Sequence, residues 1–514
     1  MKPRTILLSL AAILAVAACQ REEARAPSVP APLNQAELAA PVAVAPAIAD
    51  FYRADPDRRL WVRGGRIRPE AQPLAAMLAE HHPESARDLL GSLAAAEQGN
   101  EDALGRAELL LTAGLVRLVE ERRGEAGAMT YAEAGLAPAE AAGTPALLAG
   151  AAAATDLRAY VARAVRTNPV LDALSRGSAG YRRRWSSLPQ VQVPQGPAMA
   201  VGAQGPRVAL LRRRLGLGQG DRYDAGLARA VAEFKRVHGL SGTGGADEAT
   251  IAALNRGAGH YEAIIRLNMA RARAIPAEPG RRFVLVDTAA ARLWMFDNGA
   301  PAGTMRVIVG KQGMETPMLA GRLRYAMLNP YWNVPVDLAR DRARRVLREG
   351  TGVLARERLQ ILSQFHADDR VLRPASVNWR AVAAGREPLR LRQLPGGANV
   401  MGAVKFMLPN NLDIYLHDFP DKSLFAQSDR RLSSGCVRLE DAPALARWLF
   451  GGTAPVPQGA RPEQRVDLPE PVPVYISYFT AVPAGGGIVF QADTYGRDTA
   501  ALATLAEAKG RRRG

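Results

Sequence analysis

Apolar residues recur at three- and four-residue spacing from Phe51 to about residue 188, which is the pattern of amphipathic helices. We therefore expect a helical domain over residues 50–190. The pair His81-His82 falls in a turn between two of these helices and is interpreted as a surface feature, not as a metal site. The predicted helices lie near 69–80, 84–96, 101–122, 144–152, 155–176 and 178–186.

A second helical pattern occupies residues 197–256. Apolar residues at 208–215, 230–240 and 250–255 predict a small bundle, in which one helix ends at Gly239 and another begins at a cap formed by Thr250. The pattern resembles the peptidoglycan-binding type 1 domain, a three-helix module.

The sequence departs from this family at one position, because Lys235 stands where the family usually has Gln. Binding of glycan and a purely structural role both remain open for the module. His238 is interpreted as a structural residue at a helix end.

From Arg281 onward the apolar residues alternate with polar ones, as in strands. A polar, Arg-rich insertion at about 338–398 interrupts this rhythm, with helices expected near 338–349 and 352–360. An insertion of this length inside one domain is usually functional, and a lid is a common use. The expected elements are a hairpin of Phe283–Thr288 and Arg292–Asp297, strands at Met305–Gly310, Leu323–Asn329, Val404–Met407 and Asp413–His417, a helix near 441–450, and Val472–Ala481 with Gly487–Ala492 closing the sheet.

These patterns predict a multidomain α+β protein. An N-terminal helical scaffold precedes the three-helix module. A C-terminal, mostly-β domain spans 281–498 and includes the helical capping insertion. A tail at 499–514 is expected to be helical and then disordered.

The net charge of +17 raises the question of nucleic-acid binding, since clustered cations bind phosphate backbones. Only six of the 67 basic residues are Lys, and the Arg-Arg runs are scattered along the chain. We interpret the charge as a compositional bias and expect no nucleic-acid partner.

The first 19 residues have the features of an export signal, with Lys2 and Arg4 before an uncharged stretch too short to span a bilayer comfortably. The end of this stretch resembles a bacterial lipoprotein box, in which Cys19 is lipidated and becomes the new N-terminus. Plain secretion is the alternative. Gln20 after the cysteine suggests an outer-membrane destination, by resemblance to Gram-negative lipoproteins. Residues 20–49, rich in Ala and Pro, are expected to form a tether.

With Cys19 lipidated, Cys436 is left as a lone thiol in the periplasm, an oxidising compartment. His417 lies nineteen residues upstream at the end of an apolar strand and can act as its base. Gly435 directly before the thiol permits a turn that a Cβ would block, which aims backbone N–H groups at one point. Such groups form an oxyanion hole.

The run Ser433-Ser434-Gly435-Cys436-Val437-Arg438 resembles the signature of L,D-transpeptidases with a YkuD-like catalytic domain, although Ser434 stands where most members have His. A longer, YcbB-like subgroup shares further motifs, together with a helical scaffold, a peptidoglycan-binding unit and the insertion. The shared motifs are Leu-His-Asp at 416–418, Lys-Ser-Leu-Phe at 422–425, Val-Gly-Lys at 309–311 with Thr316-Pro317, Asn-Pro-x-Trp-Asn-Val-Pro at 329–335, Arg-Gln-x-Pro-Gly at 392–396 and Val-Lys-Phe at 404–406.

The resemblance implies that Cys436 attacks the diaminopimelate carbonyl of a peptidoglycan tetrapeptide stem and releases D-alanine. A diaminopimelate amine of a second stem then resolves the thioester into a cross-link. Water as acceptor would make the protein an L,D-carboxypeptidase, and an exported lipoprotein as acceptor would make it an anchoring enzyme. Neither a cofactor nor a metal is required, and reaction with carbapenems is expected.

The resemblance also suggests supporting roles. Gly435 and Cys436 N–H groups would serve the oxyanion, while Ser433 and Ser434 would hold the loop. Asp418 or a nearby carbonyl would orient His417. Arg438 would bind a stem carboxylate or form a structural salt bridge. Weaker candidates for the cleft are Tyr415, Trp332, Asn333 and Lys405.

Two rival functions remain. A non-enzymatic, peptidoglycan-binding outer-membrane lipoprotein would carry a degenerate catalytic domain, and the intact Cys436 and His417 count against it. A papain-like peptidase would place its cysteine before its histidine, whereas here the histidine comes first.

Overall fold

The computed structural model describes residues 46–123, 126–140, 142–363 and 370–511. Its chain divides into two compact units. The first contains the chain up to Val119 together with Ala142–Val165, and the second contains Glu120–Ala141 and Arg166–Gly514. The predicted signal, Cys19 and most of the predicted tether lie outside the described residues.

The first unit is built from helices around an apolar core that includes Tyr52 and Trp61. The carboxylate of Glu108 is fully buried and accepts the N–H groups of Leu60 at 2.6 Å and Trp61 at 2.8 Å, so it holds the loop after the first helix. The elements are α2 (Pro46–Arg53), β1 (Val62–Arg63), β2 (Arg66–Ile67), α3 (Ala71–His81), α4 (Pro83–Glu97), α5 (Glu101–Arg123, which continues into the second unit), α6 (Thr144–Ala153) and α7 (Leu157–Ala164).

Two details of this region differ from expectation. Helix α2 begins at Pro46, inside the range that we assigned to the tether, and its Ile48 and Ala49 are buried. The helix predicted at 155–176 is two helices, α7 and α8 (Pro169–Tyr181). The chain breaks before Pro169 because a proline inside a helix lacks the required N–H, and Asn168 caps the new helix.

The three-helix module consists of α9 (Pro206–Arg214), α10 (Ala225–Val237) and α11 (Glu248–Asn255). Asp247, not Thr250, caps α11, because its side chain accepts the N–H of Thr250 at 2.8 Å. Lys235 is buried and pairs with Asp247 at 2.9 Å. His238 follows α10 and is buried, as expected of a structural residue at a helix end.

The core of this module continues into the C-terminal, mostly-β part of the second unit. His238 stacks on Phe234 and on Phe490, with ring centroids 3.9 Å and 5.4 Å apart. Burial lowers the pKa of His238 to about 4. The module is therefore packed as part of a larger core, which also takes in α8 and α12 (Gly257–Arg273).

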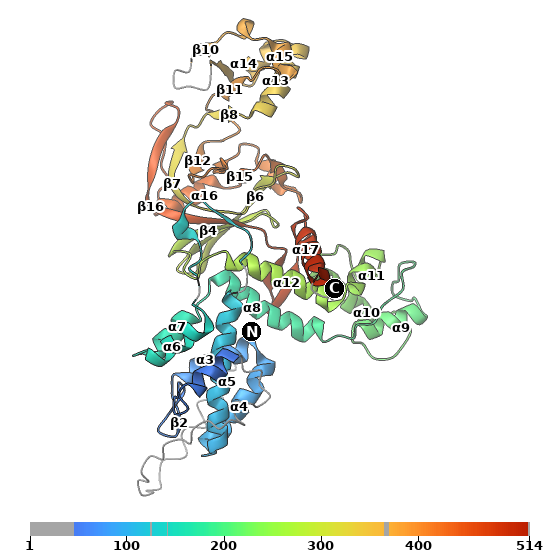
Figure 1. Ribbon diagram of the computed structural model, residues 1–514. Helices are drawn as coiled ribbons and strands as arrows, with labels where there is room; N and C mark the ends of the chain where they lie inside the picture. The colour runs from blue at the N-terminus through green and yellow to red at the C-terminus, as the bar shows by residue number, and fades with distance from the viewer. Residues whose placement is uncertain (1–45, 124–125, 141, 364–369, 512–514) are drawn as a thin grey trace. The chain divides into compact units, whose positions relative to one another are not determined.

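Ten strands form the main sheet. Its order is β12-β13-β15-β6-β5-β4-β16-β7-β3, and a pairing of β12 with β7 closes eight of these strands into a ring. Figure 1 labels β4, β6, β7, β12, β15 and β16 of this sheet. The strands are β3 (Thr130–Tyr131), β4 (Arg282–Asp287), β5 (Arg292–Asp297), β6 (Ala300–Gly310), β7 (Leu319–Leu328), β12 (Val404–Met407), β13 (Leu416–Asp418), β14 (Arg431–Ser433, on β6), β15 (Val437–Leu439) and β16 (Gln464–Ser477). Helix α16 (Ala442–Leu449) follows β15, close to the predicted position.

The capping insertion is not purely helical. It contains its own antiparallel sheet, β10-β9-β11-β8, and its own apolar core. The sheet begins at Trp332, so the folded insertion starts before residue 338, and the helix predicted at 352–360 is a short helix followed by a strand. Its elements are β8 (Trp332–Val334), α13 (Val336–Glu349), α14 (Gly352–Arg356), β9 (Leu359–Leu362), β10 (Val371–Leu372), α15 (Trp379–Ala383) and β11 (Arg390–Gln393).

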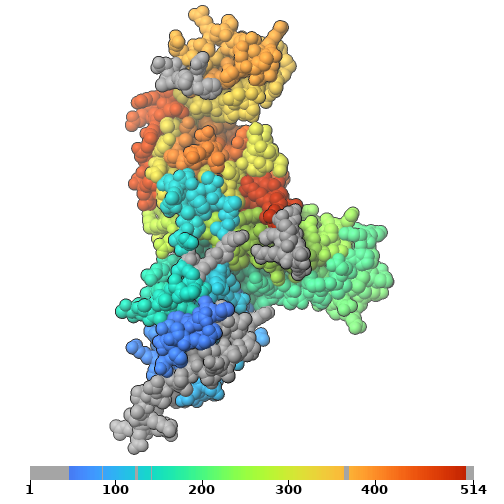
Figure 2. Space-filling view, in the orientation of Figure 1, coloured from blue at the N-terminus to red at the C-terminus, as the bar shows by residue number. Residues whose placement is uncertain are grey.

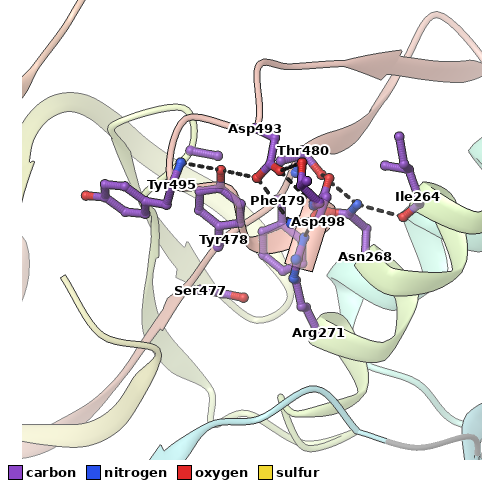
Figure 3. A network of polar contacts seen from close by, with 12 residues as sticks. Ile264, Asn268, Arg271, Ser477, Tyr478, Phe479, Thr480, Asp493, Tyr495 and Asp498 are labelled. Carbon is purple, nitrogen blue, oxygen red and sulfur yellow. Dashed lines mark hydrogen bonds and ion pairs between the residues drawn. The ribbon is translucent and has the colours of Figure 1, made fainter. Parts of the chain in front are cut away.

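The end of the chain is held by a buried polar network (Figure 3). Asn268 of α12 donates to the Thr480 hydroxyl at 2.9 Å and accepts the Thr480 N–H at 2.8 Å. That hydroxyl donates to Asp498 of α17 (Arg497–Arg511), which also pairs with Arg271 at 2.6 Å. The first turn of α17 is thus tied to α12.

The last predicted strand does not close the main sheet. Strand β18 (Gly487–Phe490) pairs only with β17 (Ala481–Ala484) in a separate hairpin. A Cβ on Gly180 of α8 would meet the carbonyl oxygen of Gly486 at 1.8 Å, so the hairpin lies directly against this helix.

Candidate active site

The candidate site is set by two neighbouring strands. Strands β13 and β15 are parallel, with Leu416 opposite Val437 and His417 opposite Arg438. Paired residues point to the same side of a sheet and side chains alternate along each strand. Tyr415 and His417 therefore share one face with Cys436 and Arg438, and all four line one cavity.

The cysteine loop adopts the expected turn. Gly435 has a φ of 118°, a conformation that L side chains rarely adopt, and a Cβ there would lie 3.3 Å from Ile414 Cδ1. Ser433 is buried, donates its hydroxyl to the Cys436 carbonyl at 2.6 Å and accepts the Gly435 N–H at 3.2 Å. Ser434 is exposed at the cavity.

Thr316 fixes this loop from the other side. Its fully buried hydroxyl accepts the Gly310 N–H at 2.9 Å and donates to the Gly435 carbonyl at 2.7 Å. A peptide's C=O and N–H point in opposite directions in the trans form. Because Thr316 draws the Gly435 oxygen into the protein, the N–H of Cys436 is directed away from Thr316.

The two predicted oxyanion donors are therefore not equivalent. The N–H of Gly435 already donates to Ser433. Within the described part of the chain, no hydrogen-bond acceptor faces the N–H of Cys436. The Cys436 N–H is the donor that remains available at the sulfur.

His417 is almost fully buried, and its Nδ1 lies 2.6 Å from the backbone carbonyl oxygen of Asp418. A carbonyl can only accept, so Nδ1 carries the proton and Nε2 keeps its lone pair. Burial and the nearby Arg438 charge lower the pKa of His417 to about 3. The imidazole is therefore neutral at pH 7, with no proton on Nε2.

The carboxylate of Asp418 does not orient His417. It accepts the Ala403 N–H at 2.9 Å and pairs with Lys422 at 2.7 Å. A Cβ on Gly402 would lie 2.2 Å from this carboxylate, so the turn before β12 is packed tightly against it. Of the two orienting groups that we considered, the structure shows the backbone carbonyl.

Burial raises the pKa of the Cys436 thiol above its usual range, against opposing effects of Tyr415 and Arg438. The thiol donates weakly to the Asp413 carbonyl, with Sγ and the oxygen 3.5 Å apart. The resting pair is thus a neutral thiol and a neutral imidazole, not an ion pair. The thiol has to turn from Asp413 toward the imidazole before proton transfer.

Arg438 is a cation at the site, and no described residue forms an ion pair with it. Its guanidinium carbon lies 4.3 Å from the centroid of the Phe419 ring. The Nε atom is buried and has no hydrogen-bond partner among the described residues, and no acidic group in that part of the chain forms an ion pair with it. The expected salt bridge is therefore not seen, which leaves Arg438 available to an anionic ligand.

The cavity has a volume of about 1140 Å³. Trp332 and Asn333 of the capping insertion line it, as does Lys405 of β12, which pairs with Glu463 at 3.1 Å. All of the residues proposed for the cleft reach it, and the capping insertion contributes directly to its lining.

Sequence reasoning missed several groups that support the site. Thr316 was noted only as part of a family motif, although its hydroxyl holds the cysteine loop. Tyr495 donates to the Gly310 carbonyl at 2.6 Å, and Arg497 donates to the Thr316 carbonyl at 3.0 Å. Tyr495 and the first residue of α17 thus support the strand and loop that hold the site, and no local sequence signal marks that role.

Among the residues that the structure describes, no cluster of His, Cys, Asp or Glu has the arrangement of a metal site. None of the described helices is both long and apolar enough to cross a membrane.

The chain is similar in sequence to a known protein. A Haemophilus influenzae protein provisionally named as an L,D-transpeptidase is 30% identical over 240 residues, which are 46% of this chain. These residues cover 48% of the relative, so the chain spans about half the length of the curated protein that it matches.

Solved structures of L,D-transpeptidases also align. One from Mycobacterium smegmatis is 13% identical over 38% of this chain and 58% of its own, with a TM-score of 0.19. One from Xylanimonas cellulosilytica is 16% identical over 55% of this chain and 98% of its own, with a TM-score of 0.18. TM-scores this low do not establish a shared overall fold.

Family models match two parts of the chain. One is the Scaffold domain, at residues 46–177. The other describes the YkuD domain, at residues 281–474, which include the strands and loop that hold His417 and Cys436. The chain therefore contains a Scaffold domain and a YkuD-type L,D-transpeptidase catalytic domain.

Proposed function

We propose that the protein is an L,D-transpeptidase that cross-links peptidoglycan through a thioester on Cys436. The observation that carries this proposal is the pairing of β13 with β15. It places a thiol and an oriented, neutral imidazole on one face of the sheet, at a cavity that also contains an uncommitted cation.

Acylation begins when the Cys436 thiol passes its proton to Nε2 of His417 and the sulfur bonds to the diaminopimelate carbonyl carbon. The carbonyl oxygen gains negative charge and accepts the Cys436 N–H. Collapse of this intermediate breaks the amide bond to D-alanine. The imidazolium returns its proton to the departing amine, which leaves a thioester and a neutral imidazole.

Transfer reverses these roles. The diaminopimelate amine of a second stem attacks the thioester and loses a proton to His417. The new amide bond forms, the carbon–sulfur bond breaks, and the thiolate recovers a proton from the imidazolium. One amide is exchanged for another, so the reaction needs no external energy source.

Whether an amine or water accepts the acyl group depends on how well water is excluded from the thioester. The capping insertion contributes Trp332, Pro335 and Leu338 to the cavity, and apolar groups over the thioester disfavour hydrolysis. We therefore favour an amine acceptor over water. The capping insertion, from Trp332 onward, would act as the covering element.

We further propose that the protein works in the periplasm, anchored to the outer membrane by lipid on Cys19. The sequence pattern at residues 1–19 supports this location. Metabolic labelling with an alkyne-bearing fatty acid should mark the wild type and not Cys19→Ala. Equal labelling of both would contradict lipidation.

Incubation with disaccharide-tetrapeptide tests the activity. Mass spectrometry should detect the cross-linked dimer, free D-alanine and a covalent stem–enzyme adduct for the wild type, and none of these for Cys436→Ala. Identical products from the two proteins would reject an enzymatic role. Tripeptide without dimer would instead identify an L,D-carboxypeptidase.

A further inference from the structure

Strand β3 brings a distant part of the chain into the catalytic cavity. Thr130 and Tyr131 fall within the range that matches the Scaffold domain, yet they pair in parallel with Leu319 and Ala320 of β7. Thr130, Tyr131 and Ala132 line the same cavity as Cys436. Figure 2 shows the segment around residue 130 as a cyan patch against the yellow and orange surface of the catalytic part.

The segment is firmly held. Thr130 N–H donates to Met318 at 3.0 Å, and Ala132 N–H donates to Ala320 at 2.8 Å. The Tyr131 hydroxyl donates to the Ala274 carbonyl at 2.7 Å. Just beyond the strand, Glu133 pairs with two arginines of β7, Arg322 at 2.6 Å and Arg324 at 2.9 Å. These contacts make the strand a fixed part of the cavity lining.

The register of β7 sets the separation between the β3 end of the cavity and His417. Leu319 pairs with Thr130 of β3, whereas Met327 pairs with Lys405, which in turn pairs with His417. Eight residues along a strand separate these two positions, or roughly 26 Å at about 3.3 Å per residue. An extended tetrapeptide covers only about 14 Å. The cavity therefore has room for two stems in line.

Its volume supports the same conclusion. Pockets for a single small ligand usually measure about 300 to 1000 Å³, and this cavity measures about 1140 Å³. An enzyme that resolves a thioester with a second stem has to hold both stems at once, so the extra space has a use.

The charges distinguish the two ends. At the thiol, the half-buried Arg438, whose Nε has no hydrogen-bond partner among the described residues, suits a carboxylate of the donor stem. Toward β3 the lining is apolar or amide, with Leu408, Pro409 and Asn411. The exposed Asp413 lies at the thiol end, where its carbonyl contacts the sulfur. Lys405 is neutralised by Glu463. The charged side chains of the lining, Lys405, Asp413 and Arg438, all lie toward the thiol, so the lining at the β3 end has no charge that would repel an ammonium group.

We propose that the cavity end formed by β3 is the binding site for the acceptor stem of the cross-linking reaction. The proposal rests on the proposed transpeptidase function. Thr130 is the residue of choice for a test, because its side chain is exposed at the cavity and its replacement leaves the strand backbone intact.

The experiment uses the full chain with disaccharide-tetrapeptide as donor and disaccharide-tripeptide as acceptor, since the tripeptide carries the amine but has no D-alanine to release. Thr130→Trp should form the stem–enzyme adduct within twofold of the wild-type rate, while dimer formation falls at least tenfold. Ala134→Trp, exposed in the same segment but outside the cavity, should match the wild type in both steps.

Two substitutions of opposite charge at Thr130 test whether the stem bound at this end carries a positive charge. Thr130→Lys should raise the KM for the tripeptide about threefold or more, and Thr130→Asp should lower it or leave it unchanged, with adduct formation constant in both. A change in donor KM instead, or equal loss of both steps, would overturn the acceptor assignment. So would unchanged dimer formation in Thr130→Trp. A wild type that forms no adduct would instead reject the transpeptidase function itself.

Discussion

The hydroxyl of Thr316 and the carbonyl of Gly435 lie 2.7 Å apart, 119 residues apart in the chain. This contact sets the peptide plane that carries the Cys436 N–H, the proposed oxyanion donor. Thr316 is a positioning residue, because it acts on the reacting carbonyl only through that plane.

Replacing Thr316 with Val keeps the shape but removes the hydrogen bond. We expect kcat for acylation to fall about 10- to 100-fold, below the roughly 100- to 1000-fold cost of losing a donor outright. The KM should change little, because the donor acts in the transition state. Thr316→Ser should recover most of kcat. A valine variant with wild-type kcat would show that the loop is held without this contact.

The pH dependence should follow the low pKa of His417. With that pKa at about 3 and the thiol pKa raised, neither group titrates between pH 5 and pH 7. We expect the acylation rate to stay constant within about twofold over this range. A rate that declines below pH 6.5, as for an ordinary histidine, would contradict the neutral resting pair.

The same group affects stability. His417 takes up a proton near pH 6.5 in the unfolded chain but only near pH 3 in the folded chain. The contribution of the neutral imidazole to the free energy of unfolding is therefore complete above pH 6.5 and is lost as the pH falls toward 3. The slope is about 1.4 kcal/mol per pH unit in that window. Urea unfolding of His417→Asn at pH 7 and pH 5 should show a smaller difference than the wild type.

Arg438 gives a prediction about the substrate. Arg438→Met keeps the stacking on Phe419 but removes the charge, so KM for the tetrapeptide donor should rise about tenfold, equivalent to about 1.4 kcal/mol. The acid limb of the rate profile should also move to higher pH, because Arg438 helps to lower the pKa of His417. Unchanged KM in this variant would remove the carboxylate role.

The glycine before the thiol tests the turn itself. Gly435→Ala places a Cβ at a φ of 118°, at a cost of about 1–3 kcal/mol, and crowds Ile414. We expect adduct formation to fall more than tenfold. Gly397→Ala is the matched control, because a Cβ there meets nothing within 4 Å. Full activity of Gly435→Ala would show that the loop tolerates another turn.

The tail network gives a stability prediction. Asp498→Asn breaks the buried pair with Arg271 and should destabilise the second unit by about 3–5 kcal/mol. Asp467→Asn breaks an exposed pair with Arg465 and should change stability by less than about 1 kcal/mol. Thermal denaturation compares the two variants. Equal melting temperatures would place the tail outside the folded core.

Local residue patterns predicted the hairpin of β4 and β5 and the turn at Gly435, because alternation and a glycine at positive φ act within a few residues. They failed at α11, where Asp247 caps the helix three residues before the predicted Thr250, and at β9, where a short strand follows α14 directly. Periodicity cannot separate a four-residue strand from the end of a helix.

Strand β3 could not be predicted at all. Thr130 and Tyr131 have no alternation of their own, and their pairing depends on β7, almost 190 residues later. From the sequence, the group that orients His417 could be either the Asp418 carboxylate or a nearby carbonyl. Choosing between them required the positions of Ala403 and Lys422, which occupy the Asp418 carboxylate.

The place of β16 in the ring has a consequence for folding. This strand lies between β4 and β7 in space but is the last of the main-sheet strands in the chain. The ring cannot close before residue 477 has been synthesised. Strand β3 has no strand to pair with until β7, nearly 190 residues later, has also been synthesised. Long-range pairing of this kind slows folding and leaves strand edges exposed. During synthesis the nascent catalytic domain should therefore depend on chaperones until its C-terminal strands are complete.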